Sequence, residues 1–181
     1  MRTNLHPRAG LRLTVPALVL GGLLGSVSGL QAHVSLENKE AVAGTSFKLV
    51  LRVPHGCGGQ ATTRIRVQVP GVFTSAKPQP KPGWTTEVAA RKTVEHTGSA
   101  GHDQASAPQE IAWSGRLEEG TYDEFVIWVA TGRNQEPTIV HVPVVQECGN
   151  AVERWIEVPT AGGKSDDLKS PAPSFKLLRP S

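Results

Sequence analysis

The chain has 181 residues and a formal net charge of +3. Arg2, Arg8 and Arg12 account for all of that charge, because removing them from the 19 basic residues leaves 16, which equals the number of acidic residues. A balanced surface lacks the basic patch that phosphate binding needs, which argues against nucleic acid as a partner. Residues 33–181 are enough for one domain with its own core.

The first 32 residues have the pattern of an export signal. Three arginines precede an apolar run over 13–24, and Ala32 offers a signal peptidase a small residue. Cleavage after Ala32 makes His33 the first residue of the exported protein, although 26–28 is a rival cleavage site. An uncleaved anchor is disfavoured because 13–30 is marginally long for a membrane span and contains a proline and four glycines.

A histidine at a free N-terminus predicts a metal site. Its α-amine and an imidazole nitrogen are spaced to close a chelate ring on one ion. Cu(II) prefers nitrogen and oxygen donors in a tetragonal plane. His33 is therefore a candidate copper ligand.

Residues 34–158 show short apolar and polar alternations divided by turn residues, with no convincing helix. In 46–53, for example, Phe47, Leu49 and Leu51 alternate with polar side chains. Strands are predicted at 34–38, 46–53, 64–69, 84–89, 109–114, 121–130, 138–146 and 152–158. This pattern favours an all-β fold, a single antiparallel β-sandwich that is immunoglobulin-like in the broad sense.

Two segments lack such alternation. Residues 91–108 are polar and rich in glycine, serine and alanine, and they predict a long mobile loop that carries His96 and His102. Residues 161–181 are rich in proline and glycine and predict a disordered tail. The tail has no apolar run, so we expect no membrane span once the signal is removed.

Two cysteines, Cys57 and Cys148, predict one disulfide in an exported protein. It would close a loop of roughly 90 residues and contribute about 4 kcal/mol on the chain-entropy model. The alternative is a soft thiolate site for Cu(I), helped by His55.

Side-chain alternation singles out one glutamate in the strand predicted at 121–130. Phe125 and Ile127 share one face of this strand, whereas Glu124 shares the other with Trp128. A carboxylate on a face that is otherwise apolar either lies at the sheet margin or holds a cation. The alternatives for Glu124 are an exposed strand carboxylate or a carboxylate that pairs with an arginine.

The strand predicted at 152–158 singles out a tryptophan. If Val152, Ile156 and Val158 form the core face, Trp155 lies on the polar face, where a tryptophan is unusual. The alternative is that Trp155 covers the open end of the sandwich or packs under the long loop.

The other aromatic and histidine residues favour structural roles. Trp84 and Trp113 are expected in the core or over a turn, and His55 and His141 are each expected to be structural. The sequence has no Gly-x-Ser-x-Gly elbow, phosphate-binding glycine loop or His-Glu-x-x-His motif.

Six motifs occur together in a consistent order along 33–160. They are HVSL (33–36), LRVPHGC (51–57), PQPKPGW (78–84), YDEF (122–125), PVVQEC (143–148) and RWIE (154–157). With these motifs the chain resembles the YcnI-like domain family.

The resemblance implies a β-sandwich over 33–160 that binds Cu(II) in a monohistidine brace. His33 would supply amine and imidazole, Glu124 an oxygen, and Trp155 would lie against the metal. Many members of the family carry a C-terminal membrane helix or an added copper-binding domain, whereas this chain ends in a proline-rich tail. Whether it acts as a membrane-tethered import component or as a diffusing carrier therefore stays open.

These observations together predict a periplasmic or secreted copper carrier or metallochaperone that is not an enzyme. Its expected partners are the copper ion and other copper-handling proteins of the cell envelope. One alternative is a copper-dependent oxidase, which needs a second histidine. The candidates for it are His55, His96, His102 and His141. Another alternative is a metal-free sandwich for adhesion or partner binding.

Overall fold

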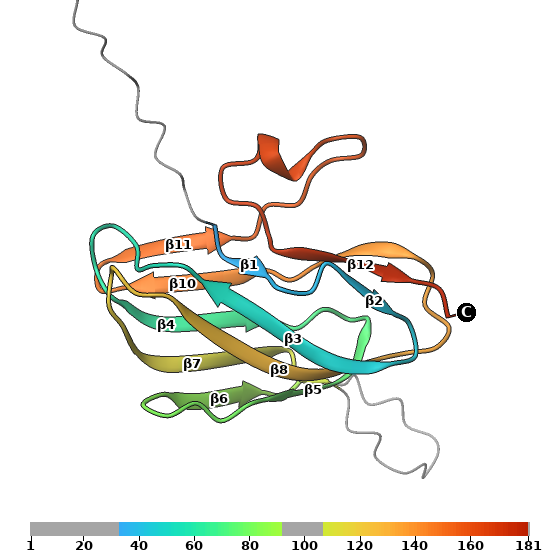
Figure 1. The fold of residues 1–181 in the computed structure, drawn as a ribbon, viewed down its shortest axis with the longest axis horizontal. Helices are drawn as coiled ribbons and strands as arrows, with labels where there is room; N and C mark the ends of the chain where they lie inside the picture. The colour runs from blue at the N-terminus through green and yellow to red at the C-terminus, as the bar shows by residue number, and fades with distance from the viewer. Residues whose placement is uncertain (1–32, 92–106, 181) are drawn as a thin grey trace, which may run out of the picture. The chain divides into compact units, whose positions relative to one another are not determined.

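A computed structural model describes residues 33–91 and 107–180 (Figure 1). Within these ranges the chain forms twelve β-strands and one short 3-10 helix, and no helix there is long and apolar enough to cross a membrane. The strands are β1 (Ser35–Leu36), β2 (Glu40–Val42), β3 (Ser46–Val53), β4 (Thr62–Gln68), β5 (Phe73–Pro78), β6 (Thr85–Ala89), β7 (Glu110–Leu117), β8 (Asp123–Thr131), β9 (Thr138–His141), β10 (Val144–Cys148), β11 (Ala151–Trp155) and β12 (Ser174–Leu178), and the helix is Ser165–Asp167.

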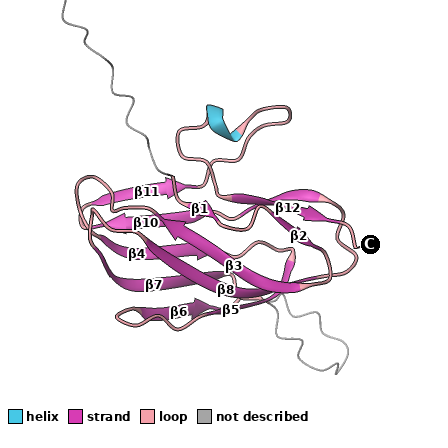
Figure 2. Cartoon of the chain, viewed as in Figure 1, coloured by secondary structure: helices cyan, strands magenta, loops and turns pink. Residues whose placement is uncertain are grey.

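The strands form three sheets, and nearly every described element is a strand (Figure 2). A four-stranded sheet has the order β1-β3-β8-β5, a five-stranded sheet the order β11-β10-β4-β7-β6, and a three-stranded sheet the order β2-β12-β9. All named pairings are antiparallel except that of β2 with β12. The predicted antiparallel β-sandwich is confirmed.

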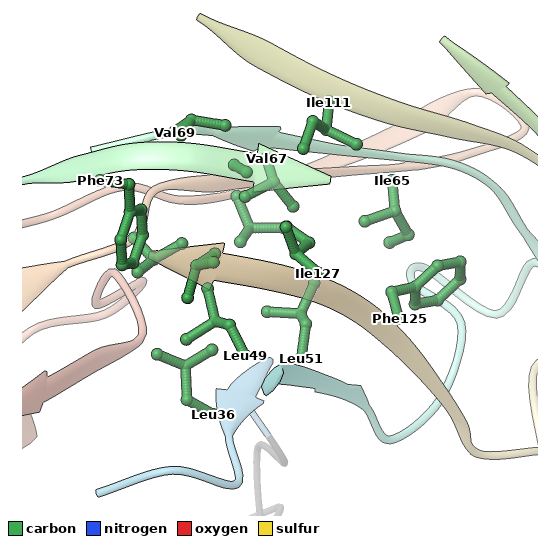
Figure 3. Packing of buried hydrophobic residues seen from close by; sticks show 14 of the residues in the cluster. Leu36, Leu49, Leu51, Ile65, Val67, Val69, Phe73, Ile111, Phe125 and Ile127 are labelled. Atoms are coloured by element: carbon green, nitrogen blue, oxygen red, sulfur yellow. The ribbon is translucent and has the colours of Figure 1, made fainter. Parts of the chain in front are cut away.

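The core lies between the four-stranded and five-stranded sheets. Figure 3 shows Leu49 and Ile127 of the first sheet meeting Ile65 and Ile111 of the second, and each is at most 2% exposed. The alternation predicted for 46–53 and 121–130 is confirmed, because side chains of one parity enter this core. The alternate side chains of these strands face outward, and Glu124 of β8 is one of them.

Two strand predictions need correction. The segment 138–146 is not one strand, because the chain breaks at Val142 and Pro143 and enters two different sheets as β9 and β10. A proline has no backbone N–H to donate to a ladder, which explains the break. Strands β2 and β5 were not predicted at all: β2 has three residues and none of them is buried, and in β5 only Phe73 and Ala76 are buried.

The prediction of a disordered tail over 161–181 is wrong for residues 174–178, which form strand β12. Strand β12 pairs with both β2 and β9, and Phe175 and Leu177 are 2% and 0% exposed. These two residues alternate with Lys176, so the strand pattern was present in the sequence. Of the predicted loop at 91–108, His96 and His102 lie outside the described residues.

Candidate metal centre

His33 lies beside Trp155 in the folded domain. Their ring centroids are 5.2 Å apart and the ring planes are tilted by 48°. His33 precedes β1, an edge strand of the four-stranded sheet, and Trp155 ends β11, an edge strand of the five-stranded sheet (Figure 1). The contact therefore joins the edges of the two sheets that enclose the core.

The face predicted for Trp155 is wrong. Trp155 is 5% exposed and belongs to the core, whereas Val152, Ile156 and Val158 are between 44% and 52% exposed. Trp155 lies opposite the fully buried Val144 in the register of β10 and β11, so both side chains point inward.

A buried amide holds the indole of Trp155. Its Nε1 donates to Oε1 of Gln146 at 3.1 Å, and Gln146 is only 1% exposed. The amide nitrogen of Gln146 donates to the carbonyl of His55 and to the hydroxyl of Thr62, each at 2.8 Å. The polar groups are therefore satisfied, as burial requires. Sequence analysis missed Gln146, although it stands between buried Val144 and Cys148 in the alternation of β10.

The predicted disulfide between Cys57 and Cys148 is confirmed. The two Cα atoms are 5.6 Å apart, and both cysteines are consumed by the bond. This excludes the thiolate site for Cu(I) in the oxidised protein. Cys148 lies two residues beyond Gln146 on the same face of β10. The disulfide therefore holds the segment that contains His55 beside Gln146, whose amide group also binds Trp155.

Glu124 lies on the outer face of the four-stranded sheet, directly opposite Arg52 of β3. The Nε atom of Arg52 is 3.4 Å from Oε1 of Glu124, and the hydroxyl of Tyr122 donates to the same oxygen. That hydrogen bond raises the pKa of Tyr122, with smaller contributions from desolvation and from the charge of Glu124. The structure therefore agrees with the alternative in which Glu124 pairs with an arginine, and the side chain is partly exposed, at 37%.

Glu124 and His33 are related through the register of the sheet. Arg52 pairs with Glu124 on one side and with Ser35 on the other, so these three residues form one row across β8, β3 and β1. His33 precedes Ser35 by two residues, at the same end of the sheet. Glu124 thus lies on the outer face in the same row as Ser35, where Arg52 also pairs with Glu37 at 3.2 Å, and Trp155 lies on the inner face.

Trp155 also lines a pocket of about 150 Å³. Its other polar side chains are His55, Glu119 and Glu153. Nδ1 of His55 contacts the carbonyl of Gly56, which supports the structural role expected for that histidine. Across 33–91 and 107–180, no three His, Cys, Asp or Glu side chains are grouped to hold a metal ion.

The donors at His33 nevertheless suit Cu(II) chemically. Because the α-amine of a cleaved N-terminus is not a side chain, His33 would offer two nitrogens and need only one further oxygen donor. Trp84 and Trp113 have the structural roles expected: Trp113 is fully buried, and the ring centroids of Trp84 and Trp113 lie 4.9 and 5.4 Å from that of Phe125.

Comparisons with known proteins agree with this fold. Residues 33–177 match the family described as "Domain of unknown function (DUF1775)", and no curated protein matches the chain. Among solved structures, the chain is similar to an uncharacterized protein from Nocardia farcinica with an immunoglobulin-like fold, at 26% identity and a TM-score of 0.63, over 81% of this chain and 98% of that one. A cohesin–dockerin complex from Clostridium thermocellum also matches, at 14% identity and a TM-score of 0.39, over 82% of this chain and 98% of that one.

Proposed function

The chain belongs to the DUF1775 family, and from this premise we propose that it is an exported Cu(II)-binding protein that acts in copper homeostasis as a carrier or metallochaperone. Its N-terminal His33 supplies amine and imidazole nitrogens, Glu124 supplies an oxygen, and Trp155 lies against the metal. The disulfide is consistent with an oxidising compartment, the periplasm or the extracellular space.

The observation that carries this proposal is the contact of His33 with Trp155. The ring of His33, the first residue after the predicted cleavage site, has its centroid 5.2 Å from that of the buried indole of Trp155. The indole Nε1 already donates a hydrogen bond to Gln146. An indole with no free donor shields a metal without competing for its ligands. One bidentate residue and one carboxylate leave coordination positions open, which suits transfer of the ion to a partner.

Binding of copper requires a change at Glu124. Its carboxylate pairs with Arg52 and accepts from Tyr122, and its side chain is 37% exposed. A surface ion pair of this kind contributes little, on the order of 1 kcal/mol or less. The carboxylate is therefore available to a divalent cation at small cost.

The experiment is electron paramagnetic resonance of the protein that begins at His33, loaded with one equivalent of Cu(II). Coupling to two nitrogen donors is expected, and a variant with one extra residue before His33 should lose the amine donor and bind much more weakly. Glu124→Gln should weaken binding because it removes a negative charge, and Trp155→Phe should change the spectrum more than the affinity.

The control is His141→Ala, which removes a histidine of the three-stranded sheet and should leave the spectrum unchanged. Equal affinity and an identical spectrum for the extended protein would show that copper binds somewhere other than the N-terminus.

A further inference from the structure

The outer face of the four-stranded sheet carries an exposed tryptophan between two lysines. Trp128 of β8 pairs in register with Lys48 of β3 on one side and with Lys77 of β5 on the other. Paired residues of neighbouring strands point to the same face, so the three side chains form one row. All three are exposed, and Trp128 retains 48% of its accessible surface.

The surroundings of this row leave the two cations unneutralised. Neither Lys48 nor Lys77 forms an ion pair with any described residue. The neighbouring row toward the end of β8 holds Ser46 and Ala130, and the row on the other side holds Val50 and Val126. The nearest carboxylate of this face on β8 is Glu124, which shares the guanidinium of Arg52 with Glu37.

The row has the chemistry of a site for an acidic sugar. The π-face of an indole carries partial negative charge, so the C–H groups of a pyranose ring pack against it favourably. Neighbouring strands are about 4.8 Å apart, which places the two lysine backbones about 10 Å from each other across the tryptophan. Acidic groups on either side of a stacked ring can then reach one ammonium each.

We propose that Lys48, Trp128 and Lys77 bind an acidic polysaccharide, with a sugar ring stacked on the indole and carboxylate or sulfate groups paired with the lysines. An anionic partner complements the two cations, because neither lysine pairs with a carboxylate in the part of the chain that the structure describes. A nucleic acid fits less well, since its affinity depends on many phosphate contacts and this row offers two cations. The site is independent of copper binding.

The test is affinity electrophoresis of the purified protein in gels that contain polygalacturonate, neutral dextran or polyphosphate. Polygalacturonate should retard the protein and dextran should not. Trp128→Ala should weaken the binding about tenfold, the typical effect of losing one stacking contact, and Lys48→Gln with Lys77→Gln should weaken it at least as much. Trp128→Phe should retain most of the affinity, and thermal unfolding should verify that each variant is folded.

A matched control exists on the three-stranded sheet. Ile139 and Lys176 are also exposed and paired in register, but Lys176 lies beside Glu40. Ile139→Ala and Lys176→Gln should leave the retardation unchanged. Absence of retardation by polygalacturonate, or retardation that Trp128→Ala does not reduce, would overturn the proposal. Equal retardation by polyphosphate would show that the lysines act by simple ion exchange and would also overturn the proposal. Binding of the same face to phosphatidylglycerol vesicles, without binding to the glycan, would show that the face binds membranes and would overturn it as well.

Discussion

The indole nitrogen of Trp155 donates a hydrogen bond of 3.1 Å to the side-chain oxygen of Gln146. Gln146 is buried and uses its amide nitrogen to bind the carbonyl of His55, in the segment that the disulfide fastens. The orientation of the indole beside His33 thus depends on a polar network inside the sandwich.

Replacement of Gln146 tests this network. Gln146→Leu leaves the indole N–H and the carbonyl of His55 without partners, and a buried unsatisfied group costs about 1–3 kcal/mol. We expect urea unfolding to show a loss of this size and near-ultraviolet circular dichroism to change. Gln79→Leu, at an exposed glutamine, should do neither. Unchanged stability for Gln146→Leu would mean that the indole does not depend on this bond.

The disulfide should stabilise the fold without forming part of the metal site. Intact mass should show the loss of two hydrogens, and reduction should lower the free energy of unfolding by about 4 kcal/mol for a loop of this length. The stoichiometry of Cu(II) binding should not change, because neither sulfur is a proposed ligand. Loss of copper binding on reduction, with the fold intact, would contradict this expectation.

Tyr122 reports on Glu124, because it is the only tyrosine in the chain. Its hydrogen bond to Glu124 raises the pKa of the phenol, so the bond is present below that pKa and is lost as pH rises through it. Glu124→Gln removes the negative charge and should lower the pKa of Tyr122 toward its ordinary value. Ultraviolet absorbance of the tyrosinate measures the shift directly. Glu153→Gln is the control and should leave the pKa of Tyr122 unchanged. The same pKa of Tyr122 in the wild type, Glu124→Gln and Glu153→Gln would show that the contact between Tyr122 and Glu124 does not persist in solution.

Affinity for Cu(II) should depend strongly on pH. Metal ions compete with protons for amine and imidazole donors, so affinity should fall steeply as pH drops from about 8 to about 5. Competition with a chelator of known affinity measures this slope. The N-terminally extended protein lacks the amine and should show a shallower slope, and equal slopes would exclude the amine as a ligand.

The oxidase alternative has its own test. Copper-loaded protein with a reductant should not cleave chitin or cellulose more than free copper does, because no second histidine is proposed at the site. Regioselective products that disappear in His55→Ala or His141→Ala would instead identify an enzyme and its missing ligand.

Several features were predictable from the sequence because they depend on local chemistry alone. Two cysteines in a chain with the pattern of an export signal predict a disulfide by count. The alternation of Phe47 and Leu49 with Lys48 indicates which face of β3 enters the core, whereas β8 is apolar on both faces from Phe125 to Val129. In the same way, Phe175 and Leu177 contain the signal for β12, although proline and glycine in the surrounding segment outweighed it.

Tertiary structure decided where Trp155 points and what surrounds it. Strand β11 carries apolar side chains on both faces, Trp155 on one and Val152 on the other, so alternation separates the faces without saying which is buried. Pairing with β10 settles this, because Trp155 lies opposite the buried Val144. The contact with His33 likewise joins residues far apart in sequence, and only the packing of the two sheets brings their edges together.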